Sequence, residues 1–123
     1  MPSARRLDGK SVGEEIRESL RPRIAAFRAA SGRGPGLGIV LAGDDGGSQI
    51  YVRNKVKACE ELGIVADFQR LSEGATLNQV MAIVDAFNRN ESIDGVLVQS
   101  PLPAGMGGDA EQQVFDVIDP AKD

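Results

Sequence analysis

Residues 37–71, LGIVLAGDDGGSQIYVRNKVKACEELGIVADFQRL, carry the pattern that decides the fold. Residues 37–42 are apolar throughout, which is typical of a strand buried on both faces of a parallel sheet. A glycine-rich turn follows, and Ser48 is the expected N-cap of a helix that ends at Gly63. Residues 65–71 are less apolar and predict a second strand, nearer the edge of the sheet.

A long helix is predicted before this run. Ser11 and Glu14 fit a Ser-x-x-Glu capping box, and apolar residues then recur at helical spacing. Pro22 falls inside the pattern and should kink or restart the helix, because proline lacks the backbone N–H. The glycines between residues 32 and 36 should end it.

Another helix and strand are predicted after the run. Thr76 and Gln79 form a Thr-x-x-Gln capping box, and residues 93–99 predict a third strand. The prolines that follow end this strand, and residues 111–119 predict a short last helix. Because the strands alternate with helices, we expect an α/β fold: a three-layer α/β/α domain with a mainly parallel sheet.

Composition excludes several classes of protein. Hydrophobic residues make up 41% of the 123 residues and charged residues 26%, which is typical of one globular domain. The net charge of −4 argues against nucleic acid as a partner, and no apolar run approaches the roughly 20 residues of a membrane span. Zero histidines and one cysteine disfavour a metal site of the zinc type. The single cysteine and the lack of an apolar leader favour a reducing, cytoplasmic compartment.

Ligands of such sheets bind at the carboxyl ends of the strands, where residues 42–51 and 99–103 are expected to lie. A glycine-rich loop at this edge suggests a phosphate cradle, but its glycines fit neither GxGxxG nor a Walker motif. Asp44 and Asp45 would also repel phosphate. Turn chemistry favours a simpler interpretation, a tight turn into a capped helix.

Tyr51 and Lys55 lie one turn apart beside the apolar stripe of the central helix. In the simpler interpretation, the tyrosine packs against the core and the lysine extends its amine to solvent. In the functional one, the ring stacks on a flat heterocycle and the amine is a proton acceptor, made less cationic by the helix dipole and partial burial. Gln99, at a strand end, could hold that amine. Cys59 fits a small core residue.

The motifs YVRNKVKACEELGI (51–64), DGVLVQSPLP (94–103) and DPAKD (119–123) resemble the bifunctional 5,10-methylenetetrahydrofolate dehydrogenase/cyclohydrolase family. The stretches LDGKSVGEEIR and GDDGGSQIYV are similar to the same family, so the resemblance covers essentially the whole chain. It implies an aminoacid-dehydrogenase-like N-terminal domain that acts on tetrahydrofolate derivatives. In that family, 5,10-methylene- and 5,10-methenyl-tetrahydrofolate are interconverted by hydride transfer, and water then gives the 10-formyl compound.

The resemblance also implies roles for single residues. Tyr51 would stack on the folate rings, Lys55 would be the general acid/base of the cyclohydrolase step, and Gln99 would position Lys55. The full set implied for catalysis and substrate binding is Tyr51, Val52, Lys55, Val98, Gln99, Ser100, Pro101 and Leu102. Ser100 is a departure, since leucine is common there, and it would make the cleft slightly more polar.

Residues 1–123 would be the catalytic, folate-binding domain of this family. The resemblance places NADP or NAD on a C-terminal Rossmann domain that is absent from this chain, so no cofactor is expected here. Lys122 and Asp123 match half of a Lys-Asp-Val-Asp-Gly motif whose second aspartate holds the pterin. Family dimers form largely through the Rossmann domain, so we expect a monomer or a weak dimer.

Two other interpretations remain at this point. The chain could be a non-catalytic folate-binding or interaction module that keeps the fold without turnover. More distantly, Asp44 and Asp45 after the first strand are similar to the acidic pair of a response regulator. The segment LVQSP, however, lacks the phosphoacceptor aspartate that such a protein needs at a strand end.

Overall fold

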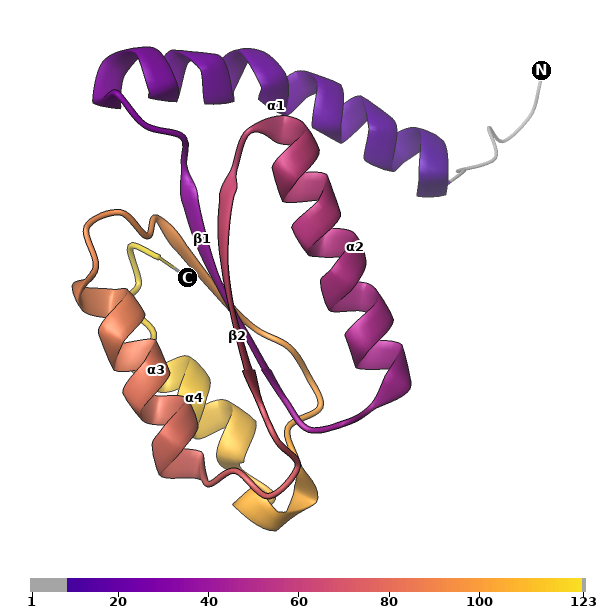
Figure 1. The fold of residues 1–123 in the computed structure, drawn as a ribbon, viewed down its shortest axis with the longest axis vertical. Coiled ribbons are helices and arrows are strands. Elements are labelled where there is room, and N and C mark those ends of the chain that lie inside the picture. Colours follow the sequence, from indigo (N-terminus) through magenta and orange to yellow (C-terminus); the bar gives the residue numbers. More distant parts are fainter. Residues whose placement is uncertain (1–8, 123) are drawn as a thin grey trace, which may run out of the picture.

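The computed structural model describes residues 9–122, in which helices alternate with the strands of one parallel sheet (Figure 1). The sheet has three strands in the order β2-β1-β3. The elements are α1 (Gly9–Ser31), β1 (Gly36–Ala42), α2 (Gly46–Leu62), β2 (Val65–Leu71), α3 (Leu77–Arg89), β3 (Gly95–Val98), the short 3-10 helix η1 (Ala104–Met106) and α4 (Ala110–Val117). The expected three-layer α/β/α architecture with a parallel sheet is confirmed.

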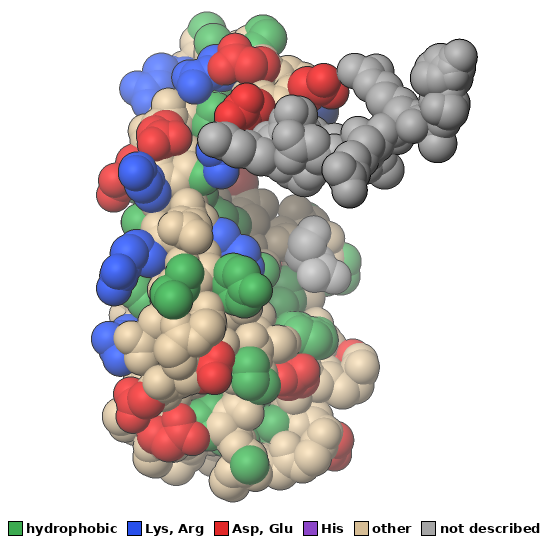
Figure 2. Space-filling model, turned by 90° about the vertical axis from the view of Figure 1, so that its right-hand side faces the viewer, with side chains coloured by type: hydrophobic (Ala, Val, Ile, Leu, Met, Phe, Trp, Pro, Cys, Tyr) green, Lys and Arg blue, Asp and Glu red, His purple; other side chains and the backbone are tan. Residues whose placement is uncertain are grey.

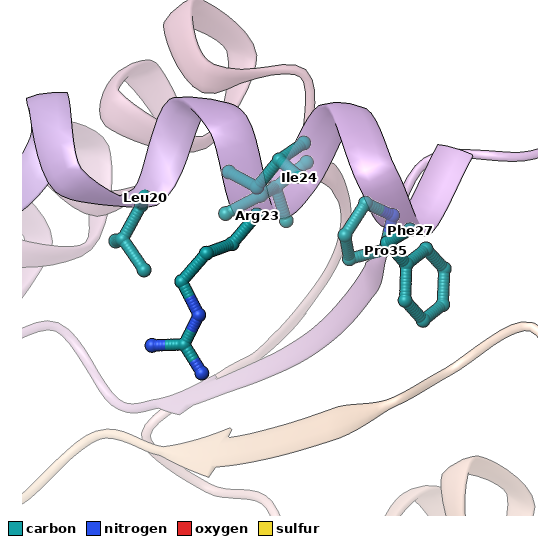
Figure 3. A pocket seen from close by; sticks show the side chains of 6 residues that line it. Leu20, Arg23, Ile24, Phe27 and Pro35 are labelled. Carbon is teal, nitrogen blue, oxygen red and sulfur yellow. The ribbon is translucent and has the colours of Figure 1, made fainter. Parts of the chain in front are cut away.

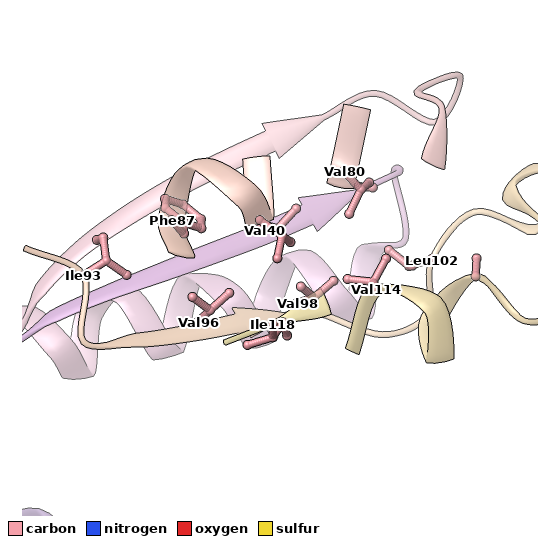
Figure 4. Packing of buried hydrophobic residues seen from close by; sticks show 12 residues of the cluster. Val40, Val80, Phe87, Ile93, Val96, Val98, Leu102, Val114 and Ile118 are labelled. Carbon is pink, nitrogen blue, oxygen red and sulfur yellow. The ribbon is translucent and has the colours of Figure 1, made fainter. Parts of the chain in front are cut away.

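The central strand β1 separates two hydrophobic clusters, because its successive side chains point to opposite faces of the sheet. Val40 and Ala42 face α3 and α4, whereas Ile39 and Leu41 face α2 together with Val52. Figure 4 shows the first cluster, in which side chains from β1, β3, α3 and α4 converge. Burial on both faces explains why the sequence of β1 is apolar throughout. Strand β2 is an edge strand of the described sheet, as predicted, and β3 forms the opposite edge.

Several predicted helix ends are confirmed and two helix starts are wrong. Gly63 ends α2 with a left-handed φ of 82°, and Thr76 with Gln79 makes the capping box of α3. Helix α1 already includes Gly9, so Ser11 lies within the helix; its side chain is outside the described residues. The N-cap of α2 is Asp45 rather than Ser48, because the Asp45 carboxylate accepts the Ser48 backbone N–H.

Other predicted bounds shift by a few residues. Pro22 lies inside α1, which continues through it to Ser31. Strand β3 covers only the middle of the predicted 93–99, although the Gln99 N–H still donates to the Val40 carbonyl at 2.9 Å. The sequence did not predict η1. Among residues 9–122 no helix combines the length and the apolar character that crossing a membrane requires.

At the amino ends of the strands, Arg33 and Asp94 join β1 to the segment before β3. The guanidinium makes two contacts with the carboxylate, at 2.8 and 3.1 Å, and the Gly36 N–H donates to the same carboxylate at 2.8 Å. The hydrogen bond from Arg33 is the main reason why the pKa of Asp94 lies below its usual value. This junction sets where β1 enters the sheet relative to β3.

We expect Asp94→Asn to lower the thermal unfolding midpoint at pH 7, because the ion pair and the charged acceptor for Gly36 are lost. The pKa of Asp94 is lowered in the folded protein, so the carboxylate stabilises it fully above the unfolded pKa of about 3.9. That stabilisation is lost as the pH falls through the folded value. The wild-type and variant midpoints, measured by circular dichroism, should therefore converge as the pH falls below about 4.

The control for this prediction is Asp85→Asn. Asp85 pairs with Arg89 at 3.2 Å, but both side chains are more than half exposed, and such pairs contribute little. This variant should keep its midpoint close to that of the wild type at pH 7. An Asp94→Asn variant as stable as wild type at pH 7 would contradict the role of the junction.

Candidate functional site

Lys55 and Gln99 meet at the carboxyl edge of the sheet, although 44 residues separate them in the sequence. The chain leaves β1 through a turn at Gly43, whose φ of 101° favours glycine, and α2 then runs back along the sheet. Lys55 lies in the third turn of α2 and Gln99 directly follows β3. The Lys55 Nζ donates to Gln99 Oε1 at 2.6 Å, so the predicted proximity of the two side chains is confirmed.

The alternation of β3 explains why Gln99 faces α2. Val96 and Val98 are buried in the cluster formed with α3 and α4, so Leu97 and Gln99 project from the opposite face. Leu97 packs on that face against the cluster that contains Val52 of α2. Helix α2 and the end of β3 therefore share one face of the sheet, and this places the amine beside the amide.

A backbone carbonyl fixes the orientation of the Gln99 amide. Gln99 Nε2 donates to the Ser100 carbonyl oxygen at 3.1 Å. A carbonyl oxygen only accepts hydrogen bonds, so the amide must turn its NH2 group to Ser100 and its oxygen to Lys55. Lys55 thus has a fixed acceptor for one of its N–H bonds, and the rest of the amine is available to a ligand or to water.

The amine and the ring of the site are open to solvent. Tyr51 is 62% exposed and Lys55 is also exposed, so the expected partial burial of the lysine is wrong for the described residues. The reason is the orientation of α2, which buries Val52 against the sheet and leaves its flank uncovered. The tyrosine ring consequently has an accessible face for a flat ligand.

The remaining predicted binding residues divide into two groups. Ser100 and Pro101, which are joined by a cis peptide bond, are exposed and adjoin Gln99. Val52, Val98 and Leu102 are buried in the two hydrophobic clusters. Their role in substrate binding stays a prediction, and Leu102 also lines a pocket beside the acidic loop. They hold the elements in place beneath the site.

The loop between β1 and α2 is acidic. The Glu73 carboxylate accepts the Asp44 N–H at 3.0 Å, and hydrogen bonds from the Ser48 hydroxyl and amide hold the pKa of Asp45 below its usual value. A Cβ added at Gly43 would overlap the Glu73 carboxylate. The space that this glycine leaves open is therefore filled by the Glu73 side chain and is not available to a phosphate. A pyrophosphate cradle presents backbone N–H groups or positive charge to the ligand, whereas this loop presents carboxylates. These residues therefore do not fit the pyrophosphate of the family's dinucleotide.

Neither Lys55 nor Gln99 lines the two pockets nearest to α1 and to the acidic loop. One, of about 280 Å³, adjoins the acidic loop and is lined by Ala42, Asp45, Glu73, Pro101, Leu102, Pro103 and Ala104. The other, of about 390 Å³, lies under α1; Figure 3 shows Leu20, Arg23 and Ile24 projecting from that helix into it. Figure 2 shows the face of the molecule on the α2 side, where acidic side chains lie near both the upper and the lower end. The amine–amide pair therefore lies on an open surface in this chain.

The structure gives structural roles to Asp45, Ser48 and Lys122 that the sequence did not predict. Asp45 caps α2, and Ser48 is buried between Asp45 and the Ser100 carbonyl. The Lys122 amine donates to three carbonyls at the end of α3, at 2.8, 2.9 and 2.8 Å. Asp123, the other residue of the predicted Lys-Asp motif, lies outside the described residues.

Cys59 is buried in α2, as predicted for a small core residue. Burial raises the pKa of its thiol, and the neighbouring Glu60 adds to the effect. Both features disfavour the thiolate, so the cysteine is unsuited to act as a nucleophile.

Comparison with known proteins gives consistent matches. Residues 7–123 match the family model described as the tetrahydrofolate dehydrogenase/cyclohydrolase catalytic domain. The Bifunctional protein FolD of Oleidesulfovibrio alaskensis is 44% identical over 117 residues, which cover 95% of this chain and 40% of the relative. FolD of Prochlorococcus marinus is 41% identical over 120 residues, which cover 98% of this chain and 39% of the relative.

Solved structures match in fold as well. The 5,10-methylenetetrahydrofolate dehydrogenase of the silkworm, Bombyx mori, superposes with a TM-score of 0.88 at 37% identity, over 98% of this chain and 41% of that one. The Trypanosoma brucei FolD structure, complexed with NADP cofactor and inhibitor, has a TM-score of 0.88 at 31% identity and covers 100% of this chain and 41% of that one. The chain spans about 40% of the length of the curated relatives that it matches.

Proposed function

Because the chain belongs to the tetrahydrofolate dehydrogenase/cyclohydrolase catalytic-domain family, we propose that it binds a folate and supports hydrolysis of 5,10-methenyltetrahydrofolate. The observation that carries this proposal is the Lys55–Gln99 contact of 2.6 Å at the carboxyl edge of the sheet. Ligands bind at that edge in open α/β sheets. In a chain with no histidine, a held lysine amine is a suitable group for moving a proton near neutral pH.

The proposed reaction begins with water beside the Lys55 amine. The water oxygen forms a bond to the cationic carbon between N5 and N10 of the folate, and one water proton passes to the Lys55 amine. The bond from that carbon to N5 then breaks, N5 takes up the proton that Lys55 holds, and the product carries a formyl group on N10. The second water proton leaves to solvent, which balances the positive charge of the substrate.

Gln99 and Tyr51 have supporting roles in this proposal. The Gln99 oxygen fixes one N–H of the amine, which leaves the rest of the amine free to face the water. Tyr51 lies one helical turn before Lys55, and its exposed ring stacks on the flat folate rings. Ser100 and Pro101 are proposed to contact the substrate next to Gln99, because both are exposed there.

We assign no hydride-transfer step to the residues of this chain. The NADP or NAD of the family carries the hydride chemistry when bound, but the acidic β1–α2 loop does not fit its pyrophosphate. We propose that a separate Rossmann domain, and not this catalytic domain, holds the dinucleotide and contributes to any family-type dimer. The hydrolytic half of the activity needs only water and the groups described above.

The test is to titrate the purified polypeptide with 5,10-methenyltetrahydrofolate and to follow both binding and the loss of the absorbance of the substrate. We expect saturable binding with turnover, and we expect Tyr51→Ala to raise the dissociation constant about tenfold because a stacking contact is lost. Tyr51→Phe, which keeps the ring, is the matched control and should bind nearly as tightly as the wild type. Equal affinity of Tyr51→Ala and Tyr51→Phe would contradict the stacking role.

The second candidate, a folate-binding or interaction module without turnover, is favoured by one observation. Lys55 and Tyr51 are exposed, and a proton-transfer site works better when water is excluded from it. Binding that is weakened by Tyr51→Ala, with no loss of substrate absorbance above the uncatalysed rate, would support this module and contradict the enzymatic proposal.

A further inference from the structure

Among the residues that the structure describes, Ser48 is the one polar residue that is buried, with 3% of its surface exposed. A buried hydroxyl needs hydrogen-bond partners, and Ser48 has two. Its Oγ donates to Asp45 Oδ2 at 2.7 Å and lies 3.3 Å from the Ser100 carbonyl oxygen. The side chain is thus enclosed between the first turn of α2 and the segment that follows β3.

The Ser100 carbonyl oxygen is shared by two side chains. It accepts from Gln99 Nε2 at 3.1 Å and from the Ser48 hydroxyl at 3.3 Å. A carbonyl oxygen has two lone pairs, so both contacts can form at once. The Ser48 hydroxyl has one hydrogen, which it shares between the Asp45 carboxylate and the Ser100 carbonyl; the shorter, charge-assisted hydrogen bond is the one to Asp45. One lone pair of the Ser100 oxygen accepts from Ser48, and the other accepts from Gln99.

Ser48 connects the two elements that carry the amine–amide pair. Lys55 lies on α2, two turns after Ser48, and Gln99 adjoins the peptide that Ser48 contacts. The chain of contacts runs from Asp45 through Ser48 and the Ser100 carbonyl to the Gln99 amide and the Lys55 amine. The position of the Ser100 carbonyl thus decides which end of the Gln99 amide it can hold, and so which end faces Lys55.

We infer that Ser48 is a positioning residue for Lys55: it fixes the Ser100 carbonyl, which orients the Gln99 amide, whose oxygen holds the amine. This inference rests on the proposed function for its catalytic consequence, although the contacts themselves do not. Without the hydroxyl the Ser100 peptide loses one of its two side-chain partners. The Gln99 amide can then rotate, and Lys55 loses its fixed acceptor.

The experiment compares Ser48→Ala, Gln99→Ala and the double variant in the purified polypeptide. Ser48→Ala keeps the backbone N–H that Asp45 accepts, so the cap of α2 is preserved. We expect Ser48→Ala to lower kcat for methenyltetrahydrofolate hydrolysis by about ten- to a hundredfold with little change in KM. In the Gln99→Ala background, Ser48→Ala should have no further effect, because the two changes break one chain of contacts.

A second readout does not depend on turnover. Acetylation of Lys55 by acetic anhydride, measured against Lys57 by peptide mass spectrometry, reports whether the amine is held. We expect Ser48→Ala to raise the Lys55 rate about fivefold relative to Lys57, the size expected for one hydrogen bond, and to have no such effect when Gln99 is alanine. Should the wild type bind without hydrolysis while this pattern appears, the positioning inference stands and the proposed function is wrong.

Two controls separate positioning from packing. Ser48→Cys keeps the volume of the side chain but replaces the hydroxyl with a weak donor, so it should behave as Ser48→Ala does. Ser19→Ala removes an exposed hydroxyl on α1 and should leave both readouts unchanged. Equal effects of Ser48→Ala with and without Gln99, or a Lys55 acetylation rate that Ser48→Ala does not change, would overturn the inference.

Discussion

Lys55→Met is expected to lower the rate of methenyltetrahydrofolate hydrolysis by about 10²- to 10⁴-fold, the range that general acid–base groups contribute. Methionine has a similar length and keeps the apolar stem of the side chain, but it can neither take up a proton nor donate to Gln99 Oε1. Substrate binding should change much less, because the stacking surface of Tyr51 remains. The measurement is kcat and KM from the loss of substrate absorbance.

Lys57→Met is the matched control for this expectation. Lys57 is an exposed lysine two residues further along α2, and residues two apart on a helix do not share a face. This variant removes the same charge from the same helix and should retain nearly the wild-type rate. A Lys55→Met variant whose kcat stays within tenfold of the wild type would rule out Lys55 as the proton-transfer group.

The meeting of Lys55 and Gln99 was predictable from local patterns and one rule of topology. Helical spacing put Tyr51 and Lys55 on one flank of α2, and the parallel sheet put the end of β3 at the same edge. The site is thus an outcome of the alternation of strands and helices. What the patterns could not give was the exposure of Lys55, because exposure depends on which segments cover α2, and periodicity does not identify them.

The burial of neighbouring residues and the start of α2 have equally specific causes. Val98 and Gln99 are neighbours in one motif, yet the period of two in a strand sends Val98 to the core and Gln99 to the face that α2 covers. A contiguous motif therefore mixes core and site residues. At the start of α2, Asp45 and Ser48 are both good N-caps, and the path of the turn at Gly43 decides for Asp45.

Gly36→Ala is expected to give the largest loss of stability of any single methyl group added to this sheet. A Cβ at this position would overlap the backbone carbonyl oxygen of Ser92. The glycine cannot retreat, because its carbonyl accepts the Asp94 N–H at 2.7 Å and its N–H donates to the Asp94 carboxylate at 2.8 Å. We expect a cost of about 3 kcal/mol, which lowers the unfolding midpoint by more than about 10 °C.

Gly74→Ala is the control that isolates this close approach. A Cβ at Gly74 meets no atom within 4 Å, and its backbone does not need a positive φ. The same substitution should therefore change the midpoint little, or raise it slightly by restricting the unfolded chain. Because the overlap at Gly36 lies between β1 and the segment before β3, its relief requires the strands to separate at their amino ends. Gly36→Ala should thus also weaken the Arg33–Asp94 ion pair. Equal unfolding midpoints for Gly36→Ala and Gly74→Ala would contradict the close approach of Gly36 to the Ser92 carbonyl.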